Sequence, residues 1–98
     1  MTYQLVTVPS AHKALKKLPK PIKTELVKAL TPLKENPHLG KQLDSPFTKL
    51  RAVKIILKGT HYRVAYEVNQ KQKEIIIHYA ATRENFYKQL RRLNLKTA

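Results

Sequence analysis

The sequence predicts a small α+β domain in which an antiparallel sheet of about four strands packs against helices. Apolar residues recur at helical spacing in the first third of the chain. In the second half, apolar residues alternate with other residues in three runs joined by short polar segments. The predicted order is therefore β-α-α-β-β-β-α, with two N-terminal helices and one C-terminal helix. The length of 98 residues suits a single domain over residues 1–98.

The N-terminal part begins with a predicted strand over Tyr3–Val8, where residues alternate and several are β-branched. Pro9 ends this strand, and Ser10 is a candidate cap for the first helix. A second helix follows the LPKP break, and its apolar stripe is formed by Ile22, Leu26, Leu30 and Leu33. Pro32 is expected to kink or interrupt this helix. The segment NPHLGKQLDSPF, residues 36–47, is expected to be an irregular loop.

The C-terminal half contains three predicted strands, over Leu50–Leu57, His61–Val68 and Glu74–Ala81. The connections KGT and NQKQK are short and polar, which predicts an antiparallel meander. The last element is a predicted helix over Glu84–Leu93, with an apolar face formed by Phe86, Leu90 and Leu93.

Strand alternation divides the side chains of these runs between two faces of the sheet. The face expected to pack on the helices carries Val53, Ile55, Leu57, Tyr62, Val64, Tyr66, Val68, Ile75, Ile77 and Tyr79. In the middle strand, the opposite face carries His61, Arg63, Ala65 and Glu67. The same alternation brings Lys54, Arg63 and His78, from three separate strands, onto one open face.

Charge is the strongest compositional signal. The chain has 20 Lys and Arg against 6 Asp and Glu, a formal net charge of +14. Self-repulsion on this scale opposes compaction, and binding to a polyanion is the usual compensation. We therefore expect a nucleic acid, an acidic protein, or both as partners.

Several classes of protein are excluded by what the sequence lacks. There are no cysteines, so disulfides and thiolate metal sites are absent. The six acids and four histidines show neither converging carboxylates nor metal-ligand spacing, and two glycines make no phosphate-binding loop. We expect no metal and no cofactor. No apolar run approaches the ~20 residues of a membrane span, and the N-terminus is unlike a signal peptide, so the cytoplasm is the expected location.

The remaining inventory of cations, phenols and imidazoles suits metal-free cleavage of RNA. The 2′-hydroxyl of RNA is the nucleophile, and the protein must move protons and stabilise the negative phosphorane. Arginine and lysine can supply the stabilising charge. DNA is excluded as a substrate for this reaction because it lacks the 2′-hydroxyl.

Arg83 and Tyr87 add a second candidate group at the start of the last predicted helix. With Thr82 as the cap, Arg83 lies in the first helical turn, where the helix dipole disfavours a cation unless an anion is bound. Tyr87 lies four residues further on and on the same helical face. The local pattern leaves open a solvated Arg83 and a packing role for Tyr87.

Three stretches, ALKKLPKPIK, KLRAVKIILKGTHYRVAYEV and IIIHYAATRENFYK, carry a resemblance to a known family. The chain resembles the RelE/ParE superfamily of bacterial toxins from type II toxin–antitoxin modules over nearly its whole length. The resemblance implies a RelE-like fold of the microbial RNase type and a ribosome-dependent endoribonuclease, an mRNA interferase that inhibits translation. It also implies a cognate acidic antitoxin, with a heterotetramer of the two as a candidate assembly, and mRNA on the ribosome as substrate. No membrane partner is expected.

The resemblance also assigns the candidate catalytic residues. By motif they are Lys54, Arg63, Arg83 and Tyr87, with His78 as the alternative acid or base. Ile56 stands where some relatives have a second lysine, which Lys58 or Lys49 could replace. The expected contacts to RNA phosphates are Lys49, Arg51, Lys58, Arg91 and Arg92.

Two other functions remain open. ParE-like members of the superfamily inhibit DNA gyrase and cut no RNA, yet share the fold and the basic charge. A noncatalytic RNA-binding module is the third reading. It is disfavoured because strand alternation is expected to turn Tyr62, Tyr66 and Tyr79 toward the helices, which leaves no exposed aromatic pair on the sheet for stacking bases.

Overall fold

The computed structural model describes residues 2–45, 47–82 and Lys88. The predicted helix Glu84–Leu93 therefore lies, apart from Lys88, outside the described residues. In chain order the elements are β1 (Gln4–Thr7), α1 (Pro9–Lys16), α2 (Lys20–Leu30), the 3₁₀ helix η1 (Thr31–Lys34), β2 (Lys41–Gln42), β3 (Leu50–Leu57), β4 (Thr60–Asn69) and β5 (Glu74–Thr82).

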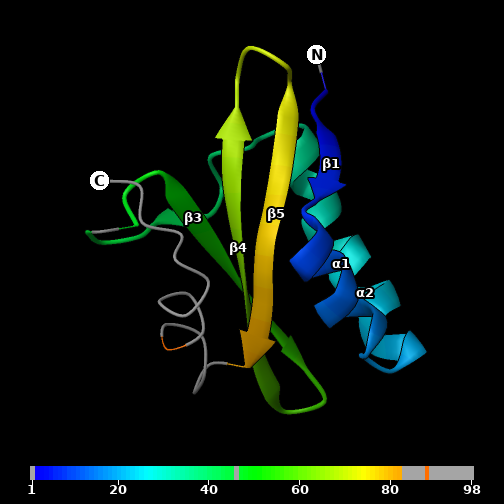
Figure 1. The fold of residues 1–98 in the computed structure, drawn as a ribbon. Helices are drawn as coiled ribbons and strands as arrows, with labels where there is room; N and C mark the ends of the chain where they lie inside the picture. The colour runs from blue at the N-terminus through cyan, green and yellow to red at the C-terminus, as the bar shows by residue number, and fades with distance from the viewer. Residues whose placement is uncertain (1, 46, 83–87, 89–98) are drawn as a thin grey trace.

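These strands form one five-stranded sheet in the order β1-β5-β4-β3-β2 (Figure 1). The three long strands pair as the predicted antiparallel meander. Two features differ from the prediction of about four antiparallel strands. β1 pairs with β5 in parallel, although the helices and the strands β2, β3 and β4 separate the two along the chain. The short strand β2 pairs with β3, within a segment predicted to be an irregular loop.

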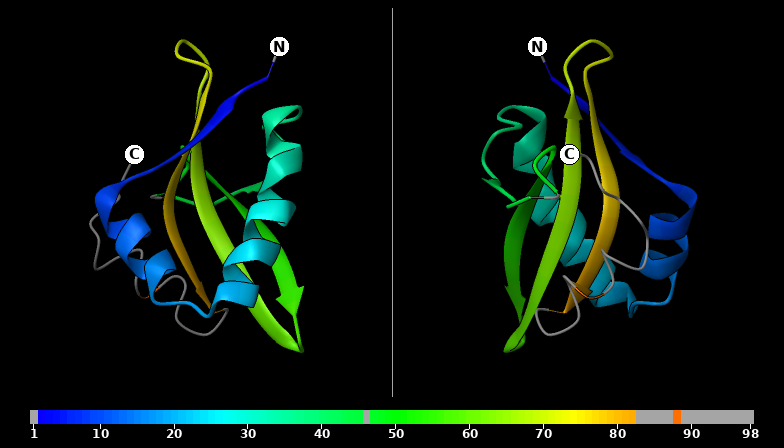
Figure 2. Two further views of the ribbon diagram at one scale, coloured as in Figure 1. Left: turned by 90° about the vertical axis from the view of Figure 1, so that its right-hand side faces the viewer. Right: turned by 60° about the vertical axis from the view of Figure 1, so that its left-hand side comes forward.

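Both helices lie on one face of the sheet (Figures 1 and 2). The predicted cap at Ser10 is wrong: α1 begins at Pro9, and its N-cap is Val8, which lies two residues before Ser10 and makes no side-chain cap hydrogen bond. Proline is favoured in the first turn because the N–H that it lacks has no intrahelical acceptor there. The predicted interruption at Pro32 is confirmed, since α2 ends at Leu30 and the chain continues as the tighter helix η1.

The helix-covered face holds the main core. Its buried residues are Ala11, Leu26, Leu30, Leu33, Ile55, Val64, Tyr66, Ile75 and Ile77. A smaller cluster lies on the opposite face, where Phe47 and Leu43 cover Leu50 and Ala65. Among residues 2–45 and 47–82, the sheet is thus packed fully on one side and only partly on the other.

The predicted inward position of Tyr79 is wrong. Ala65 pairs with Tyr79, but the next residue, Tyr66, pairs with Ile77, so His78 is an extra residue in β5. Such a bulge shifts the alternation by one residue. Tyr79 accordingly packs against the smaller cluster on the second face, whereas Ile77 remains in the main core.

Tyr66 ties the edge of the sheet to the loop before β2. Its ring is fully buried. The hydroxyl donates a hydrogen bond of 2.7 Å to the carbonyl of Pro37 and accepts one of 2.9 Å from the amide of Gly40. Because Gly40 immediately precedes β2, these two bonds hold this edge strand against β3.

Candidate functional site

The centre of the candidate site is a pair of cations on the second face of the sheet. Lys54 on β3 and Arg63 on β4 are direct cross-strand partners. Side chains of such partners leave the sheet on the same face, with Cβ atoms about 5 Å apart. The predicted juxtaposition of Lys54 and Arg63 is therefore present, and two hollows flank it.

The first hollow lies between the Lys54–Arg63 pair and the sheet edge at β2. Its volume is about 240 Å³, and its lining residues are Lys41, Gln42, Leu43, Asp44, Ala52, Lys54 and Arg63. The amide nitrogen of Gln42 donates to the carbonyl of Thr48 at 2.7 Å, which links β2 to the loop before β3. Lys41 and Gln42 were not predicted as site residues, because the sequence of this segment resembles a loop.

The second hollow lies toward the hairpin that joins β3 and β4. Its volume is about 190 Å³, and its lining residues are Lys54, Ile56, His61, Tyr62 and Arg63. His61 is exposed, and its cross-strand partner Ile56 is 63% exposed. His61 was not predicted as a site residue, although alternation places it on the same face as Arg63.

His78 also lies on the second face, but its imidazole is engaged there. Its Nε2 lies 3.0 Å from Oε1 of Glu67, and its Nδ1 is buried without a hydrogen-bond partner among the described residues. Arg63 pairs with Ala81, which is three residues along β5 from His78, or roughly 10 Å. The structure therefore brings Lys54 and Arg63 together but keeps the His78 ring beside Glu67.

The predicted phosphate contacts are dispersed. Arg51 lies three residues before Lys54 on β3, so its side chain leaves the opposite face of the sheet. There its guanidinium donates a hydrogen bond of 2.8 Å to the carbonyl of Gly40. Lys58 is exposed at φ +50° in the two-residue turn between β3 and β4, and Lys49 is exposed just before β3. The remaining predicted site residues, Arg83, Tyr87, Arg91 and Arg92, lie outside the described residues.

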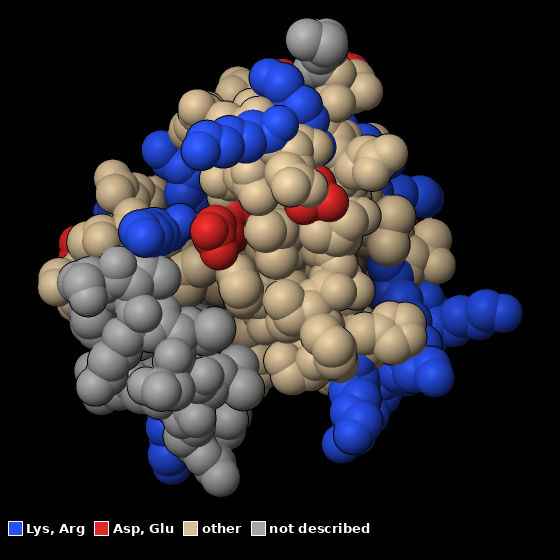
Figure 3. All heavy atoms as spheres, turned by 45° about the horizontal axis from the view of Figure 1, so that its top comes forward, with Lys and Arg blue, Asp and Glu red and all other residues tan. Residues whose placement is uncertain are grey.

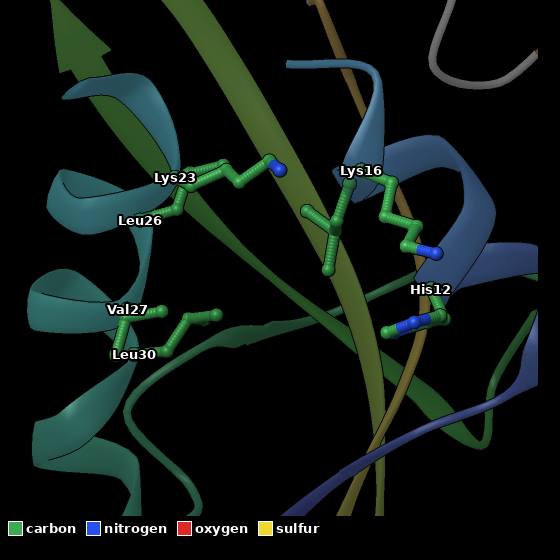
Figure 4. A pocket seen from close by; sticks show the side chains of 7 residues that line it. His12, Lys16, Lys23, Leu26, Val27 and Leu30 are labelled. Atoms are coloured by element: carbon green, nitrogen blue, oxygen red, sulfur yellow. The ribbon is translucent and has the colours of Figure 1, made fainter. Parts of the chain in front are cut away.

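A third hollow, between α1 and α2, has a different chemistry. It has a volume of about 220 Å³ and is lined by His12, Leu15, Lys16, Lys23, Leu26, Val27 and Leu30. Figure 4 shows the apolar side chains of α2 facing α1, with Lys16 and Lys23 beside them. Val27 is 59% exposed. This hollow suits an apolar surface bordered by negative charge better than a bare phosphate.

On the face shown in Figure 3, Lys and Arg side chains lie in several groups around a central area of other residues. Among residues 2–45, 47–82 and 88, no group of three or more His, Cys, Asp or Glu is placed to hold a metal ion. Within the same residues, no helix has the length and apolar character needed to cross a membrane. The fold and the site thus define a small basic α+β domain that presents Lys54 and Arg63 together on one face of its sheet.

The chain belongs to the ParE-like toxins of type II bacterial toxin–antitoxin systems, whose family model matches residues 5–91. It is accordingly the toxin component of such a system. A comparison with curated proteins found no similar sequence.

Solved structures of RelE toxins share the fold. A double mutant of E. coli RelE in the free state superposes with a TM-score of 0.73 at 22% identity, covering 95% of this chain and 99% of that one. The RelBE2 toxin–antitoxin complex from Mycobacterium tuberculosis gives 0.70 at 23% identity, covering 85% and 100%. An archaeal RelE–RelB complex from Pyrococcus horikoshii gives 0.54 at 28% identity, covering 85% and 97%.

Proposed function

We propose that this toxin is a metal-independent endoribonuclease that cleaves mRNA on the ribosome in the cytoplasm. The observation that carries the proposal is the cross-strand pair of Lys54 and Arg63 on an open face, with a hollow on either side. A phosphate above the pair would have one neighbouring nucleotide in each hollow. Two cations at one phosphate can stabilise a phosphorane without a metal ion.

The reaction follows from the chemistry of RNA. The 2′-hydroxyl loses its proton and attacks the adjacent phosphorus, the P–O5′ bond breaks, and the 5′-oxygen takes up a proton. The products are a 2′,3′-cyclic phosphate and a 5′-hydroxyl. By the resemblance, Arg83 joins Lys54 and Arg63 in holding the phosphorane, and Tyr87, with His78 as the alternative, takes part in proton transfer.

The test of the cation pair is single substitution with a matched control. Lys54→Ala and Arg63→Ala should each lower the cleavage rate about 10²–10³-fold, because each removes a charge that acts on the transition state. Lys28→Ala is the control, since Lys28 is exposed on α2, which packs on the other face of the sheet. Wild-type rates in both site variants, together with unchanged unfolding curves, would reject this pair as the site.

We propose that Lys49 and Lys58, which are exposed, bind RNA phosphates without reading sequence. The sequence pattern adds Arg91 and Arg92 as further candidates. Neutralising one true contact should flatten the salt dependence of single-stranded RNA binding by about 0.7 in the log–log slope. An unchanged slope in every single variant would remove these residues from the proposal.

An acidic antitoxin is the proposed partner. The Mycobacterium tuberculosis relative was solved as a toxin–antitoxin complex, and the Pyrococcus horikoshii relative as a RelE–RelB complex. A net charge of +14 favours rapid association with an acidic chain. We propose that one antitoxin segment covers the Lys54–Arg63 face and that an amphipathic acidic helix fills the hollow between α1 and α2.

The apolar hollow gives a test of antitoxin docking that leaves the RNA site unchanged. Val27→Lys places a charge on an exposed apolar side chain, so it should weaken antitoxin binding and spare RNA cleavage. Ala29→Lys is the charge-matched control, because Ala29 is also exposed on α2 but lies two residues from Val27, on a different face of the helix. Equal antitoxin affinity for both variants and the wild type would contradict docking at this hollow.

The family model is ParE-like, so inhibition of DNA gyrase is the second candidate function. Adding the purified toxin to cell-free translation distinguishes the two. If the toxin is a ribonuclease, translation should stop and the mRNA should be cut inside ribosomes. The upstream RNA fragments should then end in a 2′,3′-cyclic phosphate. Intact mRNA, combined with gyrase-dependent DNA breaks in a separate assay, would instead support the gyrase inhibitor.

A further inference from the structure

The hollow on the hairpin side of the Lys54–Arg63 pair contains an imidazole to which neither the family match nor the resemblance gives a role. His61 is exposed and contributes to the lining of this hollow together with both cations. It precedes Arg63 by two residues on β4, so the two side chains leave the same face roughly 7 Å apart. A phosphate held by Lys54 and Arg63 would therefore have the imidazole beside it.

The other histidine on this face is poorly placed for the same work. Nε2 of His78 lies at hydrogen-bond distance from Oε1 of Glu67. With a carboxylate as the acceptor, this ring nitrogen is the donor and is not free to take up another proton. The second nitrogen of His78 is buried. His61, in contrast, is exposed at the mouth of the hollow.

We propose that His61 is a catalytic residue that accepts the proton of the RNA 2′-hydroxyl. Histidine is the residue type best suited to proton exchange near neutral pH. As the imidazole takes the proton, the 2′-oxygen bonds to phosphorus and the P–O5′ bond breaks. The 5′-oxygen takes up a proton as it leaves, from water or from the residue that the resemblance assigns to proton transfer, and the imidazolium later returns its proton to water.

Ile56 completes this arrangement as an apolar support. It faces His61 directly across the two strands and stays largely exposed. In the hollow, its side chain would lie against the nucleotide that carries the attacking hydroxyl. The cation pair then holds the phosphate, while the neighbouring hollow at β2 receives the next nucleotide.

The experiment compares cleavage of a defined mRNA in cell-free translation by the wild type and by His61→Ala and His61→Phe. Loss of a positioned base should slow cleavage at saturating mRNA about 10²–10⁴-fold in both variants. Added imidazole should restore part of the rate to His61→Ala but not to a Lys54→Ala variant. His38→Ala is the matched control, because His38 is exposed in the loop that precedes β2.

The alternative role for His61 is stacking on a base, and His61→Phe separates the two. A phenyl ring stacks but exchanges no proton, so wild-type cleavage by His61→Phe would overturn the proposal. Wild-type cleavage by His61→Ala would overturn it as well. The inference rests on the proposed ribonuclease activity. If the wild type leaves mRNA intact, the proposed activity and the role of His61 are both rejected. If the wild type cleaves mRNA and His61→Ala cleaves it equally fast, only the role of His61 is rejected.

Discussion

Removing the hydroxyl of Tyr66 should destabilise the fold without changing the shape of its core. The hydroxyl makes the two hydrogen bonds to the backbone of Pro37 and Gly40, and both of these residues are buried. In a Tyr66→Phe variant, one carbonyl and one amide lose their partner. A buried polar group left unsatisfied costs about 1–3 kcal/mol. For the two groups together, the expected loss in the free energy of unfolding is therefore roughly 2–6 kcal/mol, a large share of the stability of a domain this size.

The pH dependence of the same variant provides an independent check. Burial raises the pKa of Tyr66, outweighing the hydrogen bond from Gly40 and the positive charge of Arg51, which lower it. A raised pKa means that the unfolded chain loses the phenol proton first, at the ordinary tyrosine pKa of ~10. The stabilisation is fully present below that pH and is lost as pH rises through the folded-state pKa. Because phenylalanine cannot ionise, the stability gap between wild type and variant should narrow above pH ~10.

Urea unfolding monitored by circular dichroism measures both effects, with the free energy of unfolding compared at neutral pH and above pH ~10. Tyr62→Phe is the control, since Tyr62 is only partly buried on the same strand. A loss below ~0.5 kcal/mol in Tyr66→Phe would mean that water replaces the hydroxyl, which would refute the stabilising role of these two bonds. A gap that widens with pH would refute the sign derived from burial.

Three further predictions concern the stability of the fold. Gly40→Ala would place a Cβ atom 2.5 Å from the Tyr66 hydroxyl oxygen, so thermal unfolding should show a loss of ~1–3 kcal/mol; wild-type stability would contradict this close approach. Lys58→Asn should raise stability by a few tenths to ~1 kcal/mol in urea unfolding, because asparagine tolerates φ +50° better than lysine, and a loss would argue against this turn. Leu26→Ala should cost about 2–5 kcal/mol and Val27→Ala far less, since these side chains are buried and exposed respectively; equal losses would contradict the orientation of α2.

Local patterns in the sequence determined most of the elements. The alternation of apolar and polar residues predicted Leu50–Leu57 with both boundaries correct, and located β4 and β5 to within one residue at each end. The prediction succeeded because these strands lie next to each other along the chain and are joined by tight connections. Their pairing therefore follows from local turn geometry.

The same local information was sufficient for the centre of the candidate site. Alternation placed Lys54 and Arg63 on one face, and the antiparallel register makes them direct partners. Alternation also placed His61 on that face. Its place in the candidate site became visible only when the hollow beside the cations was known, because side-chain spacing along one strand carries no information about concavity.

Only the tertiary structure decided the remaining features, which depend on partners distant in the sequence. β1 pairs in parallel with β5 across the two helices, and β2 exists because Tyr66 holds the preceding loop against the sheet. The bulge at His78 inserts one residue into β5 and moves Tyr79 to the other face. A local periodicity cannot reveal one extra residue or a contact 26 positions away, because the energies that favour them come from groups brought together only by the folded chain.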